Sequence, residues 1–454
     1  MRSSYADISL LCMDTRRSID PTWEGGVIEC LRNATFGLFL SCCSLYSSPL
    51  LIHLRSKHKF AWNWKRPFDA GALRAIRACQ LILDSLGPTP QSFTRVTESR
   101  MRLSSTSLYF SLVLLVPFVS AAFDPSRNDN LAVYYGQNSY GASHPTDTAG
   151  FQGNLSEYCQ DSTIDAFPLA FMNVFFSTGD LPEINLANTC NNNDNPVFQG
   201  SSLPNCQFMS DDIKACQAKG KIVTLSMGGA TGAATFTSDA QAESFAELVW
   251  DLFLGGSSDT RPFGDAVLDG VDLDIEGGGS TGYAAFVTRI RSLADGASKP
   301  YYVTAAPQCP FPDGNLGDVL NAVGFDAVYV QFYNNFCGLN NFDNPNAWNF
   351  ATWDSWARET SPNPDVKIYI GAPAAPTAAG SGYVEPDKIT SILKETQANF
   401  TSFGGAMLWD ASQAQGNDRY DQVVKSAMTG GTAAKTHKES KPSFYTQPSR
   451  FFRF

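Results

Sequence analysis

The segment LDGVDLDIEGG, residues 268–278, alternates acidic and apolar side chains and decides how the rest of the chain is interpreted. Its acids at every second position are Asp272, Asp274 and Glu276. Successive side chains of a β-strand point to opposite sides, so these acids share one face and the intervening apolar residues share the other. Asp269 is out of phase with them, and we exclude it from the candidate site.

This strand predicts an acid–base site. In a barrel of parallel strands, the apolar face packs against helices and the acidic face points inward. Neighbouring acids lie on the order of 6.6 Å apart. Like charges this close raise each other's pKa, so we expect at least one acid to keep its proton near neutral pH and to act as a general acid. A calcium loop fits less well, because such loops place Asp and Asn in flexible turns.

Eight short β-rich segments predict a parallel sheet. They are residues 131–135, 167–176, 221–227, 268–276, 301–307, 326–334, 366–373 and 404–410, with helix-like segments at 210–220, 240–256, 283–296 and 386–399. Most of the β-rich segments are apolar on both faces, as in parallel strands covered by helices. Eight strand–helix units in about 300 residues are typical of a (β/α)8 barrel, an α/β fold. A doubly wound open sheet fits less well, because no GxGxxG follows the first strand.

Residues 269–276, DGVDLDIE, match the DGxDxDxE pattern of family 18 glycoside hydrolases, the chitinase family. LSMGG (225–229) resembles the SxGG motif of the same family. Other segments resemble the class III, hevamine-like plant and fungal chitinases: LAVYYGQN (131–138), FMNVF (171–175), INLA (184–187), APQCPFPD (306–313), VQFYNN (330–335) and LWD (408–410). The resemblance covers about residues 128–427 and implies a TIM barrel. Only about 30 residues, 374–403, separate the last two strands, so we expect no extra α+β insertion subdomain and a shallow, open cleft.

The resemblance implies catalytic roles for four residues. Glu276 would be the general acid and base at the glycosidic oxygen. Asp274 would orient the substrate acetamide, Asp272 would support Asp274 electrostatically, and Tyr333 would hydrogen-bond the acetamide carbonyl. The carbonyl oxygen of an N-acetylglucosamine unit would attack the anomeric carbon, so no second enzyme carboxylate is needed as nucleophile.

Five further residues are implied to bind substrate. Gln331 would contact the sugar at the cleavage point, and Trp409 would form the hydrophobic floor beneath it. The remaining three, Tyr134, Asn173 and Gly229, match family positions that line the cleft. Without the resemblance, Trp409 and Tyr333 could equally be core residues, and Gly229 could mark a turn or close packing.

Six cysteines lie within residues 123–430, an even number that suits a disulfide framework whose pairing spacing alone does not choose. The resemblance implies the pairs Cys159–Cys216, Cys190–Cys206 and Cys309–Cys337. This part of the chain has no CxxC pair and one histidine, His144, so we expect no metal site and no cofactor.

Residues 101–122 have the layout of a secretory signal peptide: Met and Arg, an apolar run at 108–119, then small residues. The run is shorter than the roughly 20 residues that span a bilayer. We therefore expect a secreted protein, extracellular or in the cell wall, with no membrane span after processing. Because signals are N-terminal, we interpret residues 1–100 as an over-extended gene prediction without an assigned domain. Asn154 and Asn399 are candidate glycosylation sites.

Residues 123–430 form one domain in this interpretation, followed at 431–454 by a polar, basic tail that we expect to be disordered. Residues 122–430 carry 14 Lys/Arg and 35 Asp/Glu, a net charge of −21. Phosphate binding needs concentrated Lys and Arg, so nucleic acid is an improbable partner, whereas a neutral sugar is unaffected.

These observations predict a monomeric, endo-acting chitinase that cleaves β-1,4 bonds between N-acetylglucosamine units of chitin or chito-oligosaccharides. An endo-β-N-acetylglucosaminidase acting on N-glycans carries the same strand signature and is one alternative. A catalytically weak chitin-binding lectin of the same fold is another, which the presence of all four catalytic candidates disfavours.

Overall fold

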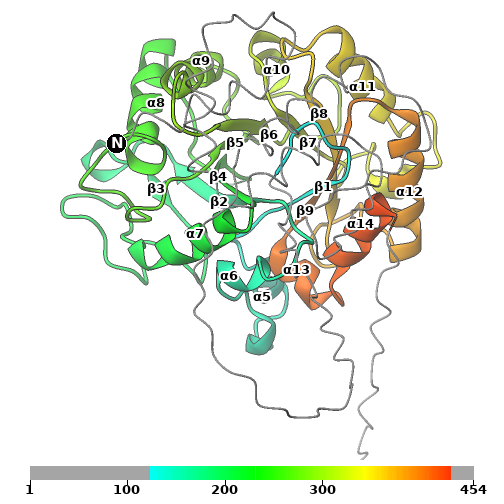
Figure 1. Ribbon diagram of the computed structural model, residues 1–454, viewed down its shortest axis with the longest axis horizontal. Coiled ribbons are helices and arrows are strands. Elements are labelled where there is room, and N and C mark those ends of the chain that lie inside the picture. Colours follow the sequence, from blue (N-terminus) through cyan, green and yellow to red (C-terminus); the bar gives the residue numbers. More distant parts are fainter. Residues whose placement is uncertain (1–122, 231, 431–454) are drawn as a thin grey trace, which may run out of the picture. The chain divides into compact units, whose positions relative to one another are not determined.

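The computed structural model describes residues 123–230 and 232–430. The extension and signal peptide predicted for residues 1–122 and the tail predicted for residues 431–454 lie outside the described residues. Within the described part, eight parallel strands close into a barrel with helices around it, which confirms the predicted (β/α)8 fold (Figure 1).

The barrel closes because β1 pairs in parallel with both β9 and β2. The strands in order around the barrel are β1 (Asn130–Val133), β2 (Ala166–Val174), β4 (Ile222–Gly228), β5 (Gly270–Asp274), β6 (Tyr302–Ala305), β7 (Ala327–Gln331), β8 (Lys367–Pro373) and β9 (Phe403–Trp409). A two-residue strand, β3 (Glu183–Ile184), adds antiparallel to β2. Each predicted strand overlaps one barrel strand, and most observed strands are shorter than predicted.

Helices fill the connections between strands. They are α5 (Ser139–Ser143), α6 (Leu155–Tyr158), α7 (Ser210–Ala218), α8 (Asp239–Phe253), α9 (Tyr283–Ala294), α10 (Gly317–Ala322), α11 (Phe350–Glu359), α12 (Pro386–Asn399), α13 (Ala411–Gly416) and α14 (Tyr420–Thr429). Short 3₁₀ turns are η2 (Thr148–Gly150), η3 (Thr178–Asp180), η4 (Gln207–Met209) and η5 (Leu339–Asn341). The four predicted helices correspond to α7, α8, α9 and α12. Between β8 and β9 the chain forms only a loop and α12, so the predicted absence of an insertion subdomain is confirmed.

Helix α8 illustrates how the sequence produces these elements. Ser238 caps its first turn by accepting a hydrogen bond from the Gln241 N–H. Its buried residues recur at helical spacing on one face: Ala242, Phe245, Ala246, Val249, Leu252 and Phe253. This apolar stripe packs against the barrel, and the polar positions between face solvent.

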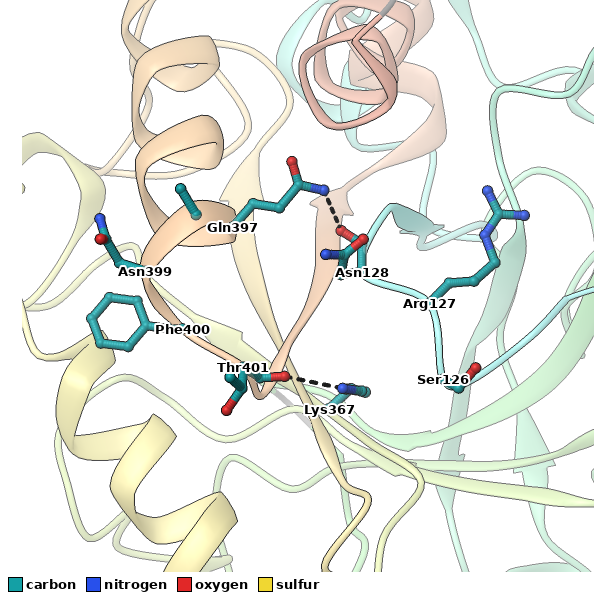
Figure 2. A pocket seen from close by; sticks show the side chains of 9 residues that line it. Ser126, Arg127, Asn128, Lys367, Gln397, Asn399, Phe400 and Thr401 are labelled. Atoms are coloured by element: carbon teal, nitrogen blue, oxygen red, sulfur yellow. Dashed lines mark hydrogen bonds between the residues drawn. The ribbon is translucent and has the colours of Figure 1, made fainter.

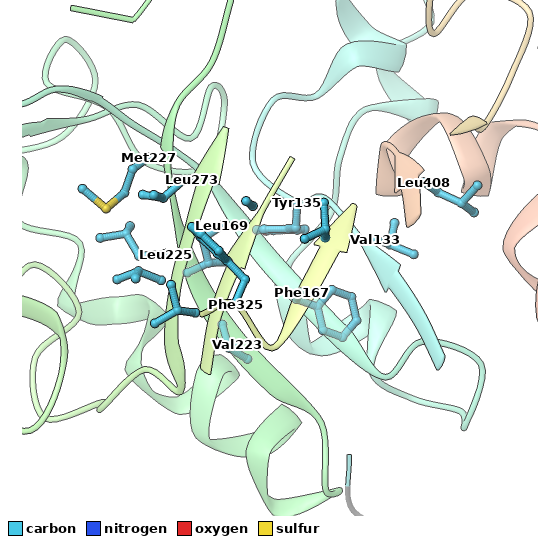
Figure 3. Close-up of a cluster of buried hydrophobic side chains, with 14 of the residues drawn as sticks. Val133, Tyr135, Phe167, Leu169, Val223, Leu225, Met227, Leu273, Phe325 and Leu408 are labelled. Carbon is cyan, nitrogen blue, oxygen red and sulfur yellow. The ribbon is translucent and has the colours of Figure 1, made fainter. Parts of the chain in front are cut away.

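Two apolar clusters separate the two faces of the strands. The larger lies between strands and helices and includes Val133, Tyr135, Leu225 and Leu273 (Figure 3). The smaller consists of residues that alternate with these along the strands: Ala132, Tyr134, Ala166, Ala170, Phe171, Ile222, Ala306, Ala327, Tyr329, Tyr333, Tyr369 and Met407. The second set fills the barrel interior, as strand alternation requires.

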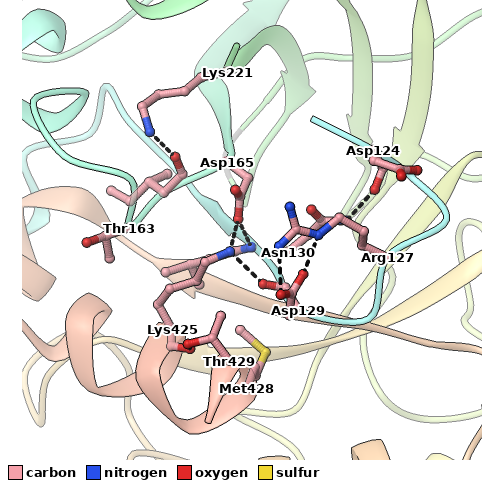
Figure 4. Close-up of polar contacts among 12 residues, drawn as sticks. Asp124, Arg127, Asp129, Asn130, Thr163, Asp165, Lys221, Lys425, Met428 and Thr429 are labelled. Atoms are coloured by element: carbon pink, nitrogen blue, oxygen red, sulfur yellow. Dashed lines mark hydrogen bonds and ion pairs between the residues drawn. The ribbon is translucent and has the colours of Figure 1, made fainter. Parts of the chain in front are cut away.

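An ionic network fastens α14 to the amino-terminal ends of β1 and β2 (Figure 4). Lys425 Nζ lies 2.6 Å from Asp165 Oδ2 and donates to the Asp129 carbonyl oxygen at 2.7 Å. Asp165 Oδ2 also accepts from the Leu131 N–H at 2.7 Å, and Arg127 pairs with Asp129 at 2.6 Å. These ion pairs lie where β1 and β2 begin, so they stabilise the amino-terminal end of the barrel, which is opposite to the end that holds the acids of β5.

A hollow of about 490 Å³ opens at this same amino-terminal end (Figure 2). It is lined by residues 126–128, Lys367 and residues 397–401, which include the glycosylation acceptor Asn399. None of the acids of β5 lines it. Across the described residues, no helix combines the length and the apolar character needed to cross a membrane.

Candidate active site

Strand β5 delivers the three predicted acids to the carboxyl-terminal end of the barrel. Asp272 and Asp274 are buried and face the interior, while Val271, Leu273 and Ile275 belong to the outer cluster. The strand ends at Asp274 rather than at residue 276, because the chain then enters a glycine-rich turn with positive φ at Gly278 and Gly279. Glu276 therefore lies just beyond the strand and is partly exposed.

Three hydroxyl groups surround Asp272. Ser226 of β4 and Thr304 of β6 are its register partners, and their Oγ and Oγ1 atoms donate to its carboxylate at 2.7 and 2.6 Å. Tyr134, one residue past β1, donates through Oη at 2.7 Å. Complete burial raises the pKa of Asp272, and these hydrogen bonds partly offset that rise.

Asp274 lies in a more repulsive environment. Gln331 Nε2 donates to its Oδ1 at 2.8 Å and to the Ala306 carbonyl oxygen at 2.9 Å. Burial first, and then the negative charges of Glu276, Asp272 and Asp313, raise the pKa of Asp274 well above its ordinary value. Asp274 therefore resists ionisation more strongly than a solvated carboxyl group does.

Glu276 also has a raised pKa, which is the property a general acid needs. Burial is the main cause, a hydrogen bond from Gln331 opposes it, and the charge of Asp313 adds to it. The mutual repulsion expected from the sequence therefore contributes at Asp274 but is not the leading cause at any of the three acids. Desolvation dominates because the barrel interior excludes water from the carboxylates.

The tyrosines of the site remain neutral O–H donors. Burial, followed by the charges of the nearby carboxylates, raises the pKa of Tyr333 well above 10, and the same causes act on Tyr134. Tyr333 follows β7 and belongs to the interior cluster, and its hydrogen bond to a substrate acetamide stays a prediction.

Trp409 ends β9 and is partly exposed over an aromatic group inside the barrel. The Phe171 ring lies parallel to it, with ring centroids 5.8 Å apart and an interplanar angle of 16°. The Tyr134 ring is tilted against it at 5.6 Å. Trp409, Phe171 and Tyr134 thus form one aromatic group, in which Phe171 was not singled out by the sequence analysis, and the role of Trp409 beneath a sugar stays a prediction.

Glycine is required where β4 approaches β5. Gly228 and Gly229 have φ of 109° and 80°, and the Gly229 N–H donates to the Asp274 carbonyl oxygen at 2.7 Å. A Cβ on Gly228 would lie 2.4 Å from that same oxygen, and one on Gly229 would lie 2.8 Å from the Phe171 ring. Gly229 therefore holds the backbone that carries Asp274 as well as lying beside the aromatic floor.

Two further predicted residues, Gln331 and Asn173, lie on β7 and β2. The amide nitrogen of Gln331 donates to Asp274 and to the Ala306 carbonyl oxygen, so it orients an acid, and its contact with a sugar stays a prediction. Asn173 lies on β2, and its Oδ1 is buried without a hydrogen-bond partner, which leaves an acceptor available.

The fourth acid of the segment, Asp269, is structural, as its phase predicted. It accepts from the Val223 N–H at 2.8 Å and pairs with Lys299 at 2.7 Å, at the amino-terminal end of β5. The disulfides are the three implied by the resemblance: Cys159–Cys216, Cys190–Cys206 and Cys309–Cys337. Both candidate glycosylation residues, Asn154 and Asn399, are exposed.

The sequence analysis missed four residues of the site: Ser226, Thr304, Phe171 and Asp313. Three of them, Ser226, Phe171 and Asp313, lie inside segments that carry the family resemblance, and Thr304 lies inside a predicted strand. Their significance depends on strand register and loop conformation, which alternation within a single strand does not reveal.

Residues 130–454 match the family described as glycosyl hydrolases family 18. The chain belongs to glycosyl hydrolase family 18. Two curated relatives in family 18 illustrate the match. "Chitinase 1" of Rhizopus niveus is 43% identical over 342 residues, which are 75% of this chain and 66% of that protein. "Endochitinase" of Saccharomyces cerevisiae is 41% identical over 344 residues, which are 74% of this chain and 56% of that protein. The chain thus spans about half to two thirds of the length of these relatives.

Solved structures share the barrel. The ICChI chitinase from Ipomoea carnea is 32% identical with a TM-score of 0.54, and the match covers 66% of this chain and 99% of that one. A xylanase and alpha-amylase inhibitor protein from Scadoxus multiflorus is 31% identical with the same TM-score and covers 67% of this chain and 98% of its own. Structures similar to this barrel therefore include a protein described as a chitinase and one described as an inhibitor.

Proposed function

We propose that this protein is a secreted, endo-acting chitinase that hydrolyses β-1,4 bonds between N-acetylglucosamine units with retention of configuration. The observation that carries the proposal is the set of three acids on β5 and the turn that follows it, of which the outermost, Glu276, is partly exposed and has a raised pKa. Family membership and the chitinase relatives support the substrate class.

In the first step of this mechanism, Glu276 donates its proton to the glycosidic oxygen as the bond from that oxygen to the anomeric carbon breaks. The acetamide carbonyl oxygen of the substrate forms a new bond to the same carbon and gives a positively charged oxazolinium ring. Asp274 and the neutral O–H of Tyr333 would hold the acetamide group in place, and the buried carboxylates would stabilise the developing positive charge.

In the second step, Glu276 takes a proton from water, and the water oxygen attacks the anomeric carbon from the side that the leaving group vacated. The bond to the acetamide oxygen breaks, so the acetamide is restored and Glu276 is protonated again. Two inversions at one carbon give net retention, and the enzyme supplies no covalent nucleophile.

The inhibitor from Scadoxus multiflorus gives a specific reason to test a binding-only function. The experiment compares hydrolysis of chitin oligomers by the wild-type protein and by Glu276→Gln, which keeps shape but cannot donate the proton. We expect a loss of about 10²–10⁴-fold in kcat, the range typical of a general acid. Equal activity in both proteins would remove Glu276 from its role, and binding without hydrolysis in either would favour a lectin.

A parallel assay with two substrates, chitin and a denatured glycoprotein, distinguishes chitin from N-glycans as the substrate. We expect release of chito-oligosaccharides from chitin and no release of glycans at the chitobiose core of a denatured glycoprotein. Proton NMR of the first products should show the β-anomer, as retention requires. Efficient glycan release with poor chitin hydrolysis would instead support the endo-β-N-acetylglucosaminidase.

A further inference from the structure

The loop between β6 and α10 carries a further buried carboxylate, Asp313, which is 8% exposed. Its Oδ2 accepts from the Gln308 N–H at 3.0 Å, and its Oδ1 accepts from the Asn315 and Leu316 N–H groups at 2.9 and 2.7 Å. Among the described residues, no Lys or Arg side chain forms an ion pair with it. Backbone amides alone therefore hold this charge, and in return the carboxylate fixes both halves of the loop.

This loop is joined to β7 next to the catalytic acids. Gln308 and Gln331 form a parallel bridge, in which the Gln331 N–H donates to the Pro307 carbonyl oxygen at 2.8 Å. The Cys309 N–H in turn donates to the Gln331 carbonyl oxygen at 3.2 Å. The backbone of Gln331 is thus held by Pro307 and Cys309, the two neighbours of Gln308. Asp313 fixes this part of the loop because it accepts a hydrogen bond from the Gln308 N–H.

The side chain of Gln331 completes a continuous path from Asp313 to the acids. Its amide nitrogen donates to Asp274 Oδ1 and to the Ala306 carbonyl oxygen. Because Ala306 is the first residue after β6, the start of the β6–α10 loop also holds this amide. Gln308 adds a second tie, because its Oε1 accepts from Asn335 Nδ2 at 3.0 Å, just past the end of β7.

We propose that Asp313 is a positioning residue for glycoside hydrolysis: it folds the β6–α10 loop against β7 so that Gln331 holds Asp274 in its working orientation. This inference rests on the proposed function, because Asp274 matters only if the site acts on a glycoside. The charge of Asp313 has a separate electrostatic effect: it raises the pKa of both Asp274 and Glu276, whereas the hydrogen bond from Gln331 lowers the pKa of both.

Asp313→Asn tests this role with little change of shape. Whichever way the new amide is oriented, one of its two terminal atoms becomes an N–H donor that faces a backbone N–H, so one tie of the loop is lost. We expect kcat on a chitin oligomer to fall about tenfold, because small misplacements of catalytic groups have effects of that order or larger. KM should change less than about twofold.

The pH profile provides a readout that general destabilisation does not move. The titratable groups facing the acid pair are Asp272, Asp313, Tyr134 and Tyr333. Hydrolysis needs protonated Glu276, and removing a neighbouring negative charge makes Glu276 easier to ionise. In a Gln331→Ala background, where the opposing hydrogen bond is absent from both proteins compared, the alkaline limb of kcat/KM should therefore move to lower pH when Asp313 is changed to Asn.

Asp326→Asn is the matched control. Asp326 also accepts a backbone N–H, from Val303 at 2.7 Å, and pairs with Arg291 at 2.9 Å, but it lies at the amino-terminal end of the barrel. This variant should lower the melting temperature without moving the alkaline limb. A double-mutant cycle with Gln331→Ala completes the design, because losses that pass through Gln331 should be strongly non-additive with Asp313→Asn.

An unchanged kcat in Asp313→Asn together with an unmoved alkaline limb in the Gln331→Ala background, or losses that simply multiply in the double mutant, would overturn the proposal. Carbon-13 NMR titration of the Asp274 carboxyl group, without substrate, separates this result from a failure of the proposed function. In the Gln331→Ala background, the pKa of Asp274 should fall when Asp313 is changed to Asn, even if the wild-type protein does not cleave chitin. An unaltered titration would count against Asp313 whatever the activity.

Discussion

At the scale of single residues, the buried acids of the site lower the stability of the folded protein at neutral pH. A carboxyl group whose pKa is higher in the folded protein than in the unfolded chain binds its proton more tightly when folded. Its stabilising effect is complete below the unfolded pKa and is lost as the pH rises through the folded pKa. Burial puts Asp272, Asp274 and Glu276 in this class. At neutral pH the fold therefore retains acids that cost stability, which is consistent with selection for chemistry.

Asp274→Asn should consequently stabilise the protein while damaging its function. The amide cannot ionise, yet its Oδ1 can still accept from Gln331. We expect the melting temperature at pH 7 to rise by about 2–4 °C, which corresponds to roughly 1 kcal/mol, and the gain to shrink toward pH 4. Hydrolysis should fall at least about 100-fold, because Asn cannot ionise as positive charge develops at the oxazolinium.

Asp269→Asn is the control for this prediction, measured by the same thermal unfolding at both pH values. Asp269 is paired with Lys299 and accepts a backbone N–H, so its neutralisation should lower the melting temperature. If both variants moved in the same direction at pH 7, the burial of Asp274 would not explain its effect.

Tyr134→Phe tests whether Asp272 works as an anion. The Tyr134 hydroxyl is one of three donors that lower the pKa of Asp272, so its removal should raise that pKa. The acidic limb of kcat/KM should then move to higher pH. A hydrogen bond to a charged group contributes about 1.5–3 kcal/mol, so we expect a loss of roughly tenfold to a hundredfold in kcat/KM.

The neighbouring residue supplies the comparison for that experiment. Tyr135 points to the outer face, where its Oη donates to the Gly153 carbonyl oxygen at 2.9 Å. Tyr135→Phe should lower stability without moving the acidic limb. A shift of equal size in both variants would show that the limb reports loss of packing and not the charge of Asp272.

At the scale of elements, the loops after β6 and β7 act as a unit. The Cys309–Cys337 disulfide joins them across 28 residues, and the Asn335–Gln308 hydrogen bond runs beside it. We expect Cys309→Ser/Cys337→Ser to lose about 2–5 kcal/mol of stability and also to lower kcat at temperatures where the protein is fully folded, because Gln331 loses its support.

Cys159→Ser/Cys216→Ser is the natural control for this disulfide. That pair spans 57 residues and joins the α6 region to α7, away from the loops around the acids. Thermal unfolding should show a comparable loss of stability, whereas kcat of the folded variant should match the wild-type value. If both double variants lost kcat equally, the link between the β6 and β7 loops would have no special role.

The elements also show what could be predicted from the sequence and what could not. Alternation along β5 correctly separated Asp272 and Asp274 from Asp269, because side-chain direction follows from strand geometry alone. The donors to Asp272 could not be found in this way. Ser226 and Thr304 are distant in sequence and meet Asp272 only through the register of β4 and β6.

Two of the helices that were not predicted, α10 and α13, were missed for a related reason. Helix α10 has only six residues, and α13 has six, so neither contains enough turns to show a 3.6-residue period. The orientation of Gln331 toward Asp274 depends on the β6–α10 loop, whose conformation is set by Asp313 rather than by any local periodicity.

At the scale of the whole molecule, the two ends of the barrel have different tasks. The amino-terminal end holds the ionic network of Asp165, Lys425 and Asp129, which ties the last helix to the first strands. Within residues 123–230 and 232–430, the acids of β5 at the carboxyl-terminal end form no ion pair with a Lys or Arg side chain. The ion pairs that stabilise the fold thus lie at the end of the barrel where no chemistry is proposed. Their contribution offsets the cost of burying unpaired carboxyl groups at the other end.

The architecture also limits how the proposed enzyme could move along its substrate. Processive hydrolysis requires walls that retain a polymer chain after each cleavage. Here residues 374–402 connect β8 to β9 through a loop and α12, and α12 packs against β9 and α14 instead of rising above the barrel. We therefore expect frequent release from crystalline chitin, measured as new reducing ends that divide between the soluble and the insoluble fractions. Long runs that produce almost entirely soluble dimers would contradict this, because they would require an enclosure that the β8–β9 connection does not build.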